Sequence, residues 1–225
     1  MGNSVSDDLD LLVLVRELFR QVLHIGAGIF AFGLRWFGFW YGACFAFIAF
    51  FWNLLVMPRL FRLTFRESEN VAGYSRGMIA YPVSVLLLIV FFPLPIAAAQ
   101  WAVLSIADGA ATFSGALFGR KKVFYNPGKS YIGSAVLFVF SFGASWFAFW
   151  FTQSNWASSS FIWQGKDLNA CLAGLSLFQA ALICLASSVV NTIIESIPLP
   201  SWLDDNLTVP LTGAIMMLLV SAVFC

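Results

Sequence analysis

The chain has 225 residues, of which 60% are hydrophobic and only 10% are charged, and its formal net charge is +1. A soluble domain carries roughly 25% charged residues, so this composition excludes a water-soluble fold. The length predicts one compact membrane-embedded domain, residues 1–225, without a separate soluble module, and we expect no nucleic-acid partner.

Residues 1–15 form a polar tail, and seven apolar stretches follow it. A transmembrane helix needs roughly 20 apolar residues, and the stretch from Gly77 to Leu117 is too long for one. Pro93 and Pro95 divide it, because proline disrupts a helix interior. The expected spans are Leu18–Leu34, Trp36–Met57, Gly77–Phe92, Pro95–Leu117, Tyr131–Thr152, Ala170–Ile194 and Leu207–Phe224. The sequence therefore predicts an all-α, polytopic integral membrane helical bundle of about seven transmembrane helices.

The basic residues are distributed unevenly between the two sides of this predicted bundle. If the spans alternate in direction, only Arg35 and Lys166 lie on one side. Basic loops are retained in the cytoplasm during insertion, so we expect the other side to be cytoplasmic, in a bacterial inner membrane or, in a eukaryote, the endoplasmic reticulum. That side holds Arg16, Arg20, Arg59, Arg62, Arg66, Arg76, Arg120, Lys121, Lys122 and Lys129.

The four cysteines lie in apolar runs without paired spacing. We expect each of them to be a small core residue that identifies neither a redox compartment nor a metal site. They are Cys44, Cys171, Cys184 and Cys225.

Glu17, Arg20 and His24 lie at the cytoplasmic entry to the first predicted span. Offsets of three and four residues place these side chains on one helical face. Two interpretations are equally good: one wall of a site, or a capping Glu, a surface-reaching Arg and a core His.

Asp108 lies in the middle of an apolar stretch that is long enough to cross a bilayer, and Gly109 follows it directly. An ionisable side chain within a membrane is costly and by default marks a functional site. Ordinary helix packing does not explain this carboxylate.

A glycine pair and a cationic cluster follow Asp108. Gly115 and Gly119 have the spacing of a helix-packing motif. Lys121 and Lys122 belong to a basic run that is suited to phosphate groups. Helix packing followed by a positively charged loop is the alternative explanation for these residues.

Lys129, Ser130, Gly133 and Ser134 lie around the start of the fifth predicted span. Backbone amides, hydroxyls and a Lys at a helix N-terminus form a natural anion site. The leading Gly of a P-loop is missing, since Lys121 occupies its position, and no strand precedes the motif. A soluble nucleotide-binding fold is therefore excluded.

Carboxylates and an amide lie between the last two predicted spans, at Glu195, Asp204, Asp205 and Asn206. These are hard oxygen ligands of the kind that Mg²⁺ prefers. The alternative is that Asp204 or Asp205 caps the final helix.

All of these groups fall on the same predicted side of the membrane. They combine carboxylates for a metal, cations for phosphates and a face that is open to lipid. This combination indicates phosphoryl or nucleotidyl transfer to a membrane-embedded substrate.

Five segments, in order along nearly the whole chain, resemble signatures of the dolichol kinase and phytol kinase family. Gln21 stands where that family usually has Lys or Arg, and Ile132 stands where it usually has Glu. The segments are Glu17-Leu18-Phe19-Arg20-Gln21-Val22-Leu23-His24, Ala80-Tyr81-Pro82, Asp108-Gly109 through Gly119-Arg120-Lys121, Lys129-Ser130 with Gly133-Ser134, and Leu203-Asp204-Asp205-Asn206-Leu207-Thr208-Val209-Pro210.

The resemblance implies an integral membrane kinase that phosphorylates a lipid alcohol, commonly with CTP as the donor. We expect an isoprenoid alcohol such as phytol, dolichol or another polyprenol as the acceptor. A CTP-dependent diacylglycerol kinase is the close alternative. A cytidylyltransferase acting on a lipid phosphate, as in the more distant CDP-diacylglycerol synthases, and an ion-coupled transporter are further alternatives.

The expected roles of the site residues follow from the motifs and the resemblance together. The catalytic set is Asp108, His24, Glu17 and Arg20, with His24 or a carboxylate accepting the proton of the alcohol. Mg²⁺ or another divalent cation is expected at Asp108, Asp204, Asp205, Asn206 and Glu195. The nucleotide phosphates are expected at Gly109, Gly115, Gly119, Lys121, Lys122, Lys129, Ser130, Gly133 and Ser134.

Overall fold

The computed structural model describes residues 19–60, 75–154, 166–200 and 202–225. It is a helical bundle with one two-stranded hairpin, so the predicted all-α membrane class is confirmed. The elements are α2 (Ile29–Phe51), a π-helical turn (Trp52–Val56), α3 (Met57–Leu60), α5 (Arg76–Phe91), α6 (Leu94–Ala102), a second π-helical turn (Val103–Ala107), α7 (Asp108–Phe118), β1 (Lys122–Val123), β2 (Asn126–Ser130), α8 (Tyr131–Gln153), α9 (Lys166–Gly174), α10 (Leu177–Ser196) and α11 (Asp205–Phe224).

Five helical segments of the described chain are long and apolar enough to cross a membrane. The expected number of seven is not confirmed. Helix α5 has only 16 residues, and the segment Phe19–Leu60, where two spans were predicted, counts as one. The five are Phe19–Leu60, Leu94–Phe118, Tyr131–Gln153, Leu177–Ser196 and Asp205–Phe224.

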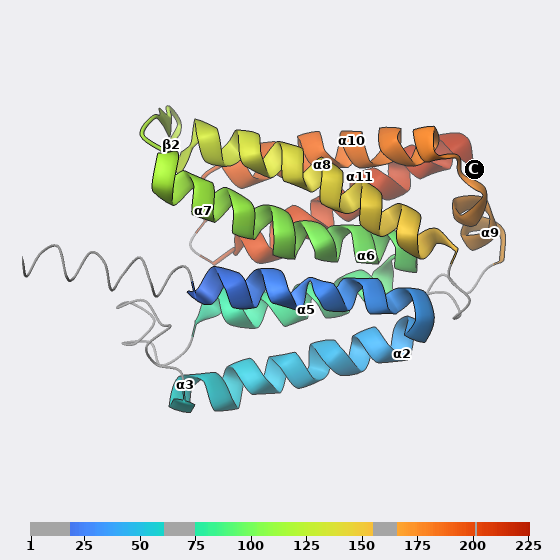
Figure 1. Ribbon diagram of the computed structural model, residues 1–225, viewed down its shortest axis with the longest axis horizontal. Helices are drawn as coiled ribbons and strands as arrows, with labels where there is room; N and C mark the ends of the chain where they lie inside the picture. Colours follow the sequence, from blue (N-terminus) through green and yellow to red (C-terminus); the bar gives the residue numbers. More distant parts are fainter. Residues whose placement is uncertain (1–18, 61–74, 155–165, 201) are drawn as a thin grey trace, which may run out of the picture.

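The segment Phe19–Leu60 is folded back on itself at Gly38, where φ is 67° and ψ is −155°. Glycine reaches this region without the steric cost that a Cβ brings. Figure 1 shows the chain running the length of the bundle before this turn and returning along the remainder of α2 afterwards. The sequence predicted the break at Arg35, three residues before the turn that the structure has at Gly38.

The span expected over Ala170–Ile194 is also different in the structure. A short helix, α9, ends at Gly174, and α10 begins at Leu177. Ser176 and Gln179 form a capping box between them, in which each side chain bonds the backbone N–H of the other. Such a box fixes a helix start, so the apolar pattern alone placed this start too early.

Helix α6 forms the centre of the bundle. All nine of its residues are buried, and it packs against α2, α5, α8 and α11. Gln100 of α6 donates to Ser187 at 2.8 Å and accepts from Asn191 at 3.2 Å, which links it to α10. Asn191 also donates to Ser141 of α8 at 3.1 Å. Hydrogen bonds of this kind hold helices together where water is absent.

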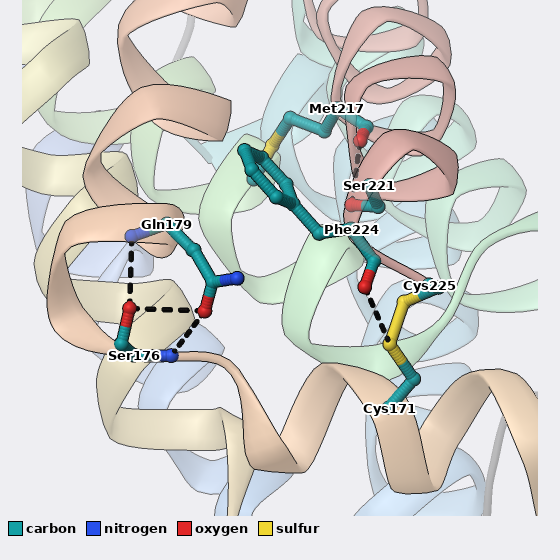
Figure 2. The surroundings of a disulfide bond; sticks show 7 residues. All are labelled: Cys171, Ser176, Gln179, Met217, Ser221, Phe224 and Cys225. Carbon is teal, nitrogen blue, oxygen red and sulfur yellow. Dashed lines mark hydrogen bonds between the residues drawn. A yellow bond between two sulfur atoms is a disulfide. The ribbon is translucent and has the colours of Figure 1, made fainter.

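A disulfide joins Cys171 of α9 to Cys225 at the end of α11 (Figure 2). This corrects the expectation that all four cysteines are isolated core residues. Cys184 is buried and free as expected, whereas Cys44 is free but exposed. The paired cysteines are 54 residues apart, so only the packing of α9 against the end of α11 brings them together.

The two ends of the bundle differ in character (Figure 1). One end carries the β1–β2 hairpin, α3 and the start of α5, and the other carries α9 and Cys225. The hairpin is antiparallel and was not anticipated from the sequence. It connects α7 to α8 and places Lys129 and Ser130 directly at the start of α8.

Candidate functional site

A cavity of about 880 Å³ opens at the end of the bundle that carries the hairpin. This volume lies in the range of small-molecule sites, roughly 300 to 1,000 Å³. Residues of the first described helix (residues 19–27), α5, α7, α8, α10, α11 and the hairpin all contribute to its wall. The predicted site residues that line it are Arg20, His24, Asp108, Gly115, Lys122, Lys129, Ser130, Gly133, Ser134, Glu195, Asp204, Asp205 and Asn206.

Three of the predicted site residues in the described part of the chain are not part of this wall. Glu17 lies outside the described residues. Gly109 faces the first helix, where a Cβ would come within 2.9 Å of Ile25. Gly119 lies under Ser130, where a Cβ would come within 2.8 Å of that side chain. Both glycines permit close packing of helix ends, and the exposed Lys121 lies outside the cavity lining.

Asp108 is the first residue of α7, directly after the π-helical turn. Its Oδ2 lies 3.4 Å from Nε2 of His24, and the two side chains are 25% and 19% exposed, respectively. His24 Nε2 also lies 2.7 Å from the carbonyl oxygen of Leu104. The carboxylate therefore faces the cavity rather than lipid, beside the helix that carries Arg20 and His24.

Lys129 lies between two carboxylates from different helices. Its Nζ donates to Glu195 of α10 and, at 2.8 Å, to Asp205 of α11. Burial alone would lower the pKa of Lys129, but the two negative charges outweigh this and raise the pKa above its ordinary value. Lys129 is therefore a permanent cation that neutralises part of the acidic wall.

Asp204 and Asn206 are fixed by the start of α11. Asp204 is the N-cap, and its side chain accepts from the backbone N–H of Asn206 at 3.0 Å. Burial and the neighbouring charge of Asp205 raise the pKa of Asp204. Ser84 of α5 donates to the backbone carbonyl of Asn206 at 2.5 Å. The capping role is thus real, and Asp204 performs it while still bordering the cavity.

The start of α8 has the arrangement expected of an anion site. The Ser130 side chain accepts from the backbone N–H of Gly133 at 3.1 Å and so caps the helix. A Cβ at Gly115 would come 3.3 Å from Ser130 Oγ, so the small residue permits α7 to approach this end of α8. Backbone amides at a helix N-terminus favour anions because of the helix dipole.

Several cavity residues were not identified from the sequence as parts of a site. Ser75, Gly77 and Met78 at the start of α5 line the cavity, as do Ala111 and Thr112 of α7. The Ser75 side chain caps α5 by accepting from the N–H of Met78. A Ser before an apolar helix is a recognisable start signal, but it carries no sign of a ligand.

The donor set partly fits a divalent cation. Carboxylate and amide oxygens of α7, α10 and α11 border one cavity, which is the ligand chemistry that Mg²⁺ prefers. Within the described part of the chain, however, no three acidic, His or Cys side chains are grouped closely enough to hold a metal ion. The ammonium group of Lys129 lies between Glu195 and Asp205 and supplies part of the positive charge that such an ion would bring.

The chain is similar in sequence to curated plant proteins that are named as phytol or farnesol kinases. The chain is 33% identical over 138 residues to phytol kinase 1, chloroplastic, of Arabidopsis thaliana, which covers 60% of the chain and 40% of that protein. It is 29% identical over 149 residues to probable phytol kinase 3, chloroplastic, of Glycine max, covering 63% of the chain and 40% of that protein. It is 28% identical over 220 residues to farnesol kinase, chloroplastic, of Arabidopsis thaliana, covering 89% and 64%.

The matched region is thus less than two thirds of each of these relatives. No protein-family model matches the chain, and no solved structure gives a significant match. The resemblance that the motifs indicated is confirmed at the level of these curated relatives.

Proposed function

The chain is a relative of the phytol and farnesol kinases, and from this relationship we propose that it is a membrane-embedded lipid-alcohol kinase. The acceptor is an isoprenoid alcohol such as phytol, farnesol or another polyprenol. The phosphoryl donor is a nucleoside triphosphate, for which we propose CTP with a divalent cation.

One observation supports this proposal most strongly. The 880 Å³ cavity combines acidic side chains, a Lys and a capped helix N-terminus within a bundle of apolar helices. A polyphosphate needs the cations and backbone amides. A long-chain alcohol needs the lipid-facing helices beside them, so a donor and an acceptor of opposite polarity meet at one place.

The reaction itself requires mainly positioning and neutralisation of charge. The alcohol oxygen forms a bond to the terminal phosphorus while the bond from that phosphorus to the bridging oxygen breaks. The products are a lipid monophosphate, a nucleoside diphosphate and a proton. Lys122, Lys129 and the amides at the start of α8 line the cavity where they can hold the phosphates.

A bound Mg²⁺ would supply further neutralisation of the phosphate charge. Asp108, Asp205 and Asn206, with Asp204 and Glu195, are the residues that would hold it. Arg20 and His24 form the neighbouring wall of the cavity.

The alternatives differ in their products. Diacylglycerol as the acceptor would give phosphatidic acid, and a cytidylyltransferase would release pyrophosphate. An ion-coupled transporter would consume no nucleotide. The charged side chains that line the cavity lie at one end of the bundle rather than along a path through it, which disfavours the transporter.

The test is an assay of purified protein with each nucleotide, Mg²⁺ and a panel of phytol, farnesol, dolichol and diacylglycerol. We expect CTP to give CDP and a phosphorylated isoprenoid alcohol. Pyrophosphate as the product, or phosphorylation of diacylglycerol alone, would replace the proposed reaction by the corresponding alternative. Absence of nucleotide consumption with every acceptor would reject a kinase.

We also propose that the cavity end faces the cytoplasm or its organellar equivalent. Arg20, Arg59 and Arg76 lie in elements at this end, with the basic residues of the hairpin. Arg35 is at the opposite end, where it donates to the carbonyl of Phe151. The disulfide lies at that opposite end as well, and disulfides persist mainly in oxidising compartments.

Thiol labelling with a membrane-impermeant reagent tests this orientation in cells or sealed vesicles. Cys44 and Cys184 are first replaced by Ser, and a single cysteine is then placed at Phe124, which is 85% exposed. We expect Phe124→Cys to react only after permeabilisation. Ser154→Cys, at the exposed end of α8 beyond Gln153, should react without it. The reverse pattern would contradict the proposed orientation.

A further inference from the structure

Behind His24 lies a closed chain of buried hydrogen bonds that the proposed chemistry does not use. Trp101 Nε1 donates to the Tyr81 hydroxyl oxygen at 2.8 Å. Ser105 Oγ donates to the carbonyl of Trp101 at 2.9 Å. The Tyr81 and Ser105 oxygens are 2.6 Å apart.

The direction of each bond in this chain is determined. An indole N–H can only donate, and a carbonyl oxygen can only accept. Since the Ser105 proton is directed at the Trp101 carbonyl, the Tyr81 hydroxyl must donate to Ser105 Oγ. Every donor is then satisfied in a place without water, and such a network holds its members in one arrangement.

This network fixes the ring that lies against His24. The Tyr81 and His24 rings meet edge to face, with centroids 4.8 Å apart and an interplanar angle of 69°. Tyr81 and Ser105 are buried. Gly28, four residues after His24 and the N-cap of α2, lies so close to Ser105 that an added Cβ would come 2.7 Å from the Cβ of Ser105. The segment from His24 to Gly28 therefore packs directly against Tyr81 and Ser105 of this network.

The π-helical turn Val103–Ala107 supplies the remaining contact. Leu104 lies within this turn, and its carbonyl oxygen is 2.7 Å from His24 Nε2. Because a carbonyl oxygen has no proton to donate, His24 Nε2 must be the donor in this bond. In the neutral ring, the proton is therefore on Nε2, and Nδ1 is the nitrogen without a proton. π-Helical turns of this kind often occur at functional sites.

We propose that Tyr81, held by Trp101 and Ser105, is a positioning residue that fixes His24 with its proton on Nε2. The fixed ring then lies beside the Asp108 carboxylate, whose Oδ2 is 3.4 Å from the same nitrogen. The inference rests on the proposed function for its catalytic consequence, whereas the state of the ring is independent of it.

The ring can be observed directly, because His24 is the single histidine of the chain. Protein labelled with ¹⁵N-histidine gives one pair of ring nitrogen signals in NMR. We expect a protonated Nε2 and an unprotonated Nδ1 for the neutral ring. A proton on Nδ1 with Nε2 bare would overturn the proposal in the unmodified protein, without any variant or substrate.

Tyr81→Phe and Trp101→Phe each remove one hydrogen bond and keep an aromatic ring. We expect either change to produce mixed or broadened ring signals of His24. Misplacement by a fraction of an ångström lowers kcat by on the order of tenfold or more, while KM for the nucleotide stays the same. Tyr41→Phe is the matched control, since Tyr41 belongs to the helix after the Gly38 turn and packs against Phe37. It should leave both the ring signals and kcat unchanged.

The outcomes separate this inference from the proposed function. Unchanged His24 signals and unchanged kcat in Tyr81→Phe and Trp101→Phe would overturn the positioning role. The expected ring state and its disturbance in these variants, together with no phosphorylation of any lipid alcohol, would support the arrangement of His24 and reject the kinase instead.

Discussion

Asp108→Asn is expected to abolish phosphoryl transfer while the protein still inserts and folds. The substitution removes one charge and keeps the shape of the side chain. The carboxylate is 25% exposed to the cavity and lies beside His24, so its negative charge is available to a metal ion and to the reacting groups. Losing it should lower kcat by at least about a hundredfold, equivalent to about 2.7 kcal/mol of transition-state stabilisation.

The measurement is the initial rate of lipid phosphorylation under saturating nucleotide. Thermal unfolding and gel filtration in detergent are measured in parallel, and both should resemble those of the unmodified protein. Near-normal activity of Asp108→Asn would show that this residue serves packing or insertion, and the proposed chemistry would lose its central group.

Lys129→Met is expected to affect both stability and activity. The ammonium pairs with Glu195 and Asp205, whose side chains are 10% and 38% exposed. Removing the cation leaves two neighbouring carboxylates without compensation. Breaking a buried pair costs roughly 3–5 kcal/mol, and we expect about 2 kcal/mol here because the pair is partly open to water.

A double variant distinguishes this electrostatic cost from a simple loss of packing. Lys129→Met combined with Glu195→Gln restores the charge balance, so the double variant should unfold at a higher temperature than Lys129→Met alone. Activity should not return, and in the single variant KM for the nucleotide should rise more than KM for the lipid, since an ammonium contacts phosphates.

Lys121→Met, at an exposed lysine outside the cavity lining, is the charge-matched control and should resemble the unmodified protein. Equal unfolding temperatures for Lys129→Met and the double variant would contradict the pairing. An unchanged KM for the nucleotide in Lys129→Met would contradict the role in phosphate binding.

Much of this protein is determined by local sequence. The apolar stretches place most of the helices within a few residues, because each residue contributes separately to the free energy of burying the chain in lipid. Asp108 is recognisable for the same reason, since a charged side chain within an apolar membrane segment is energetically costly. The Asp204 cap and the capped start of α8 are likewise local, and the motifs around them predicted the positions of these helix starts.

Other features depend on which helices become neighbours. The charge of Lys129 was visible in the sequence, but its carboxylate partners lie 66 and 76 residues away. The sequence assigned Lys121 and Lys122 the same role, whereas the hairpin directs only Lys122 into the cavity lining. Gly109 and Gly119 were expected at phosphates and instead permit close packing.

The sequence by itself thus determined the membrane class, the approximate helices and the charged residues that are costly to bury. Each of these is a property of a short segment placed in a lipid bilayer. Only the tertiary structure decided the pairing of Cys171 with Cys225, the fixed ring of His24 and the ion pairs of Lys129. These contacts join residues that are far apart along the chain. They follow from the way the helices pack and from the directions of their side chains, which no spacing within one segment specifies.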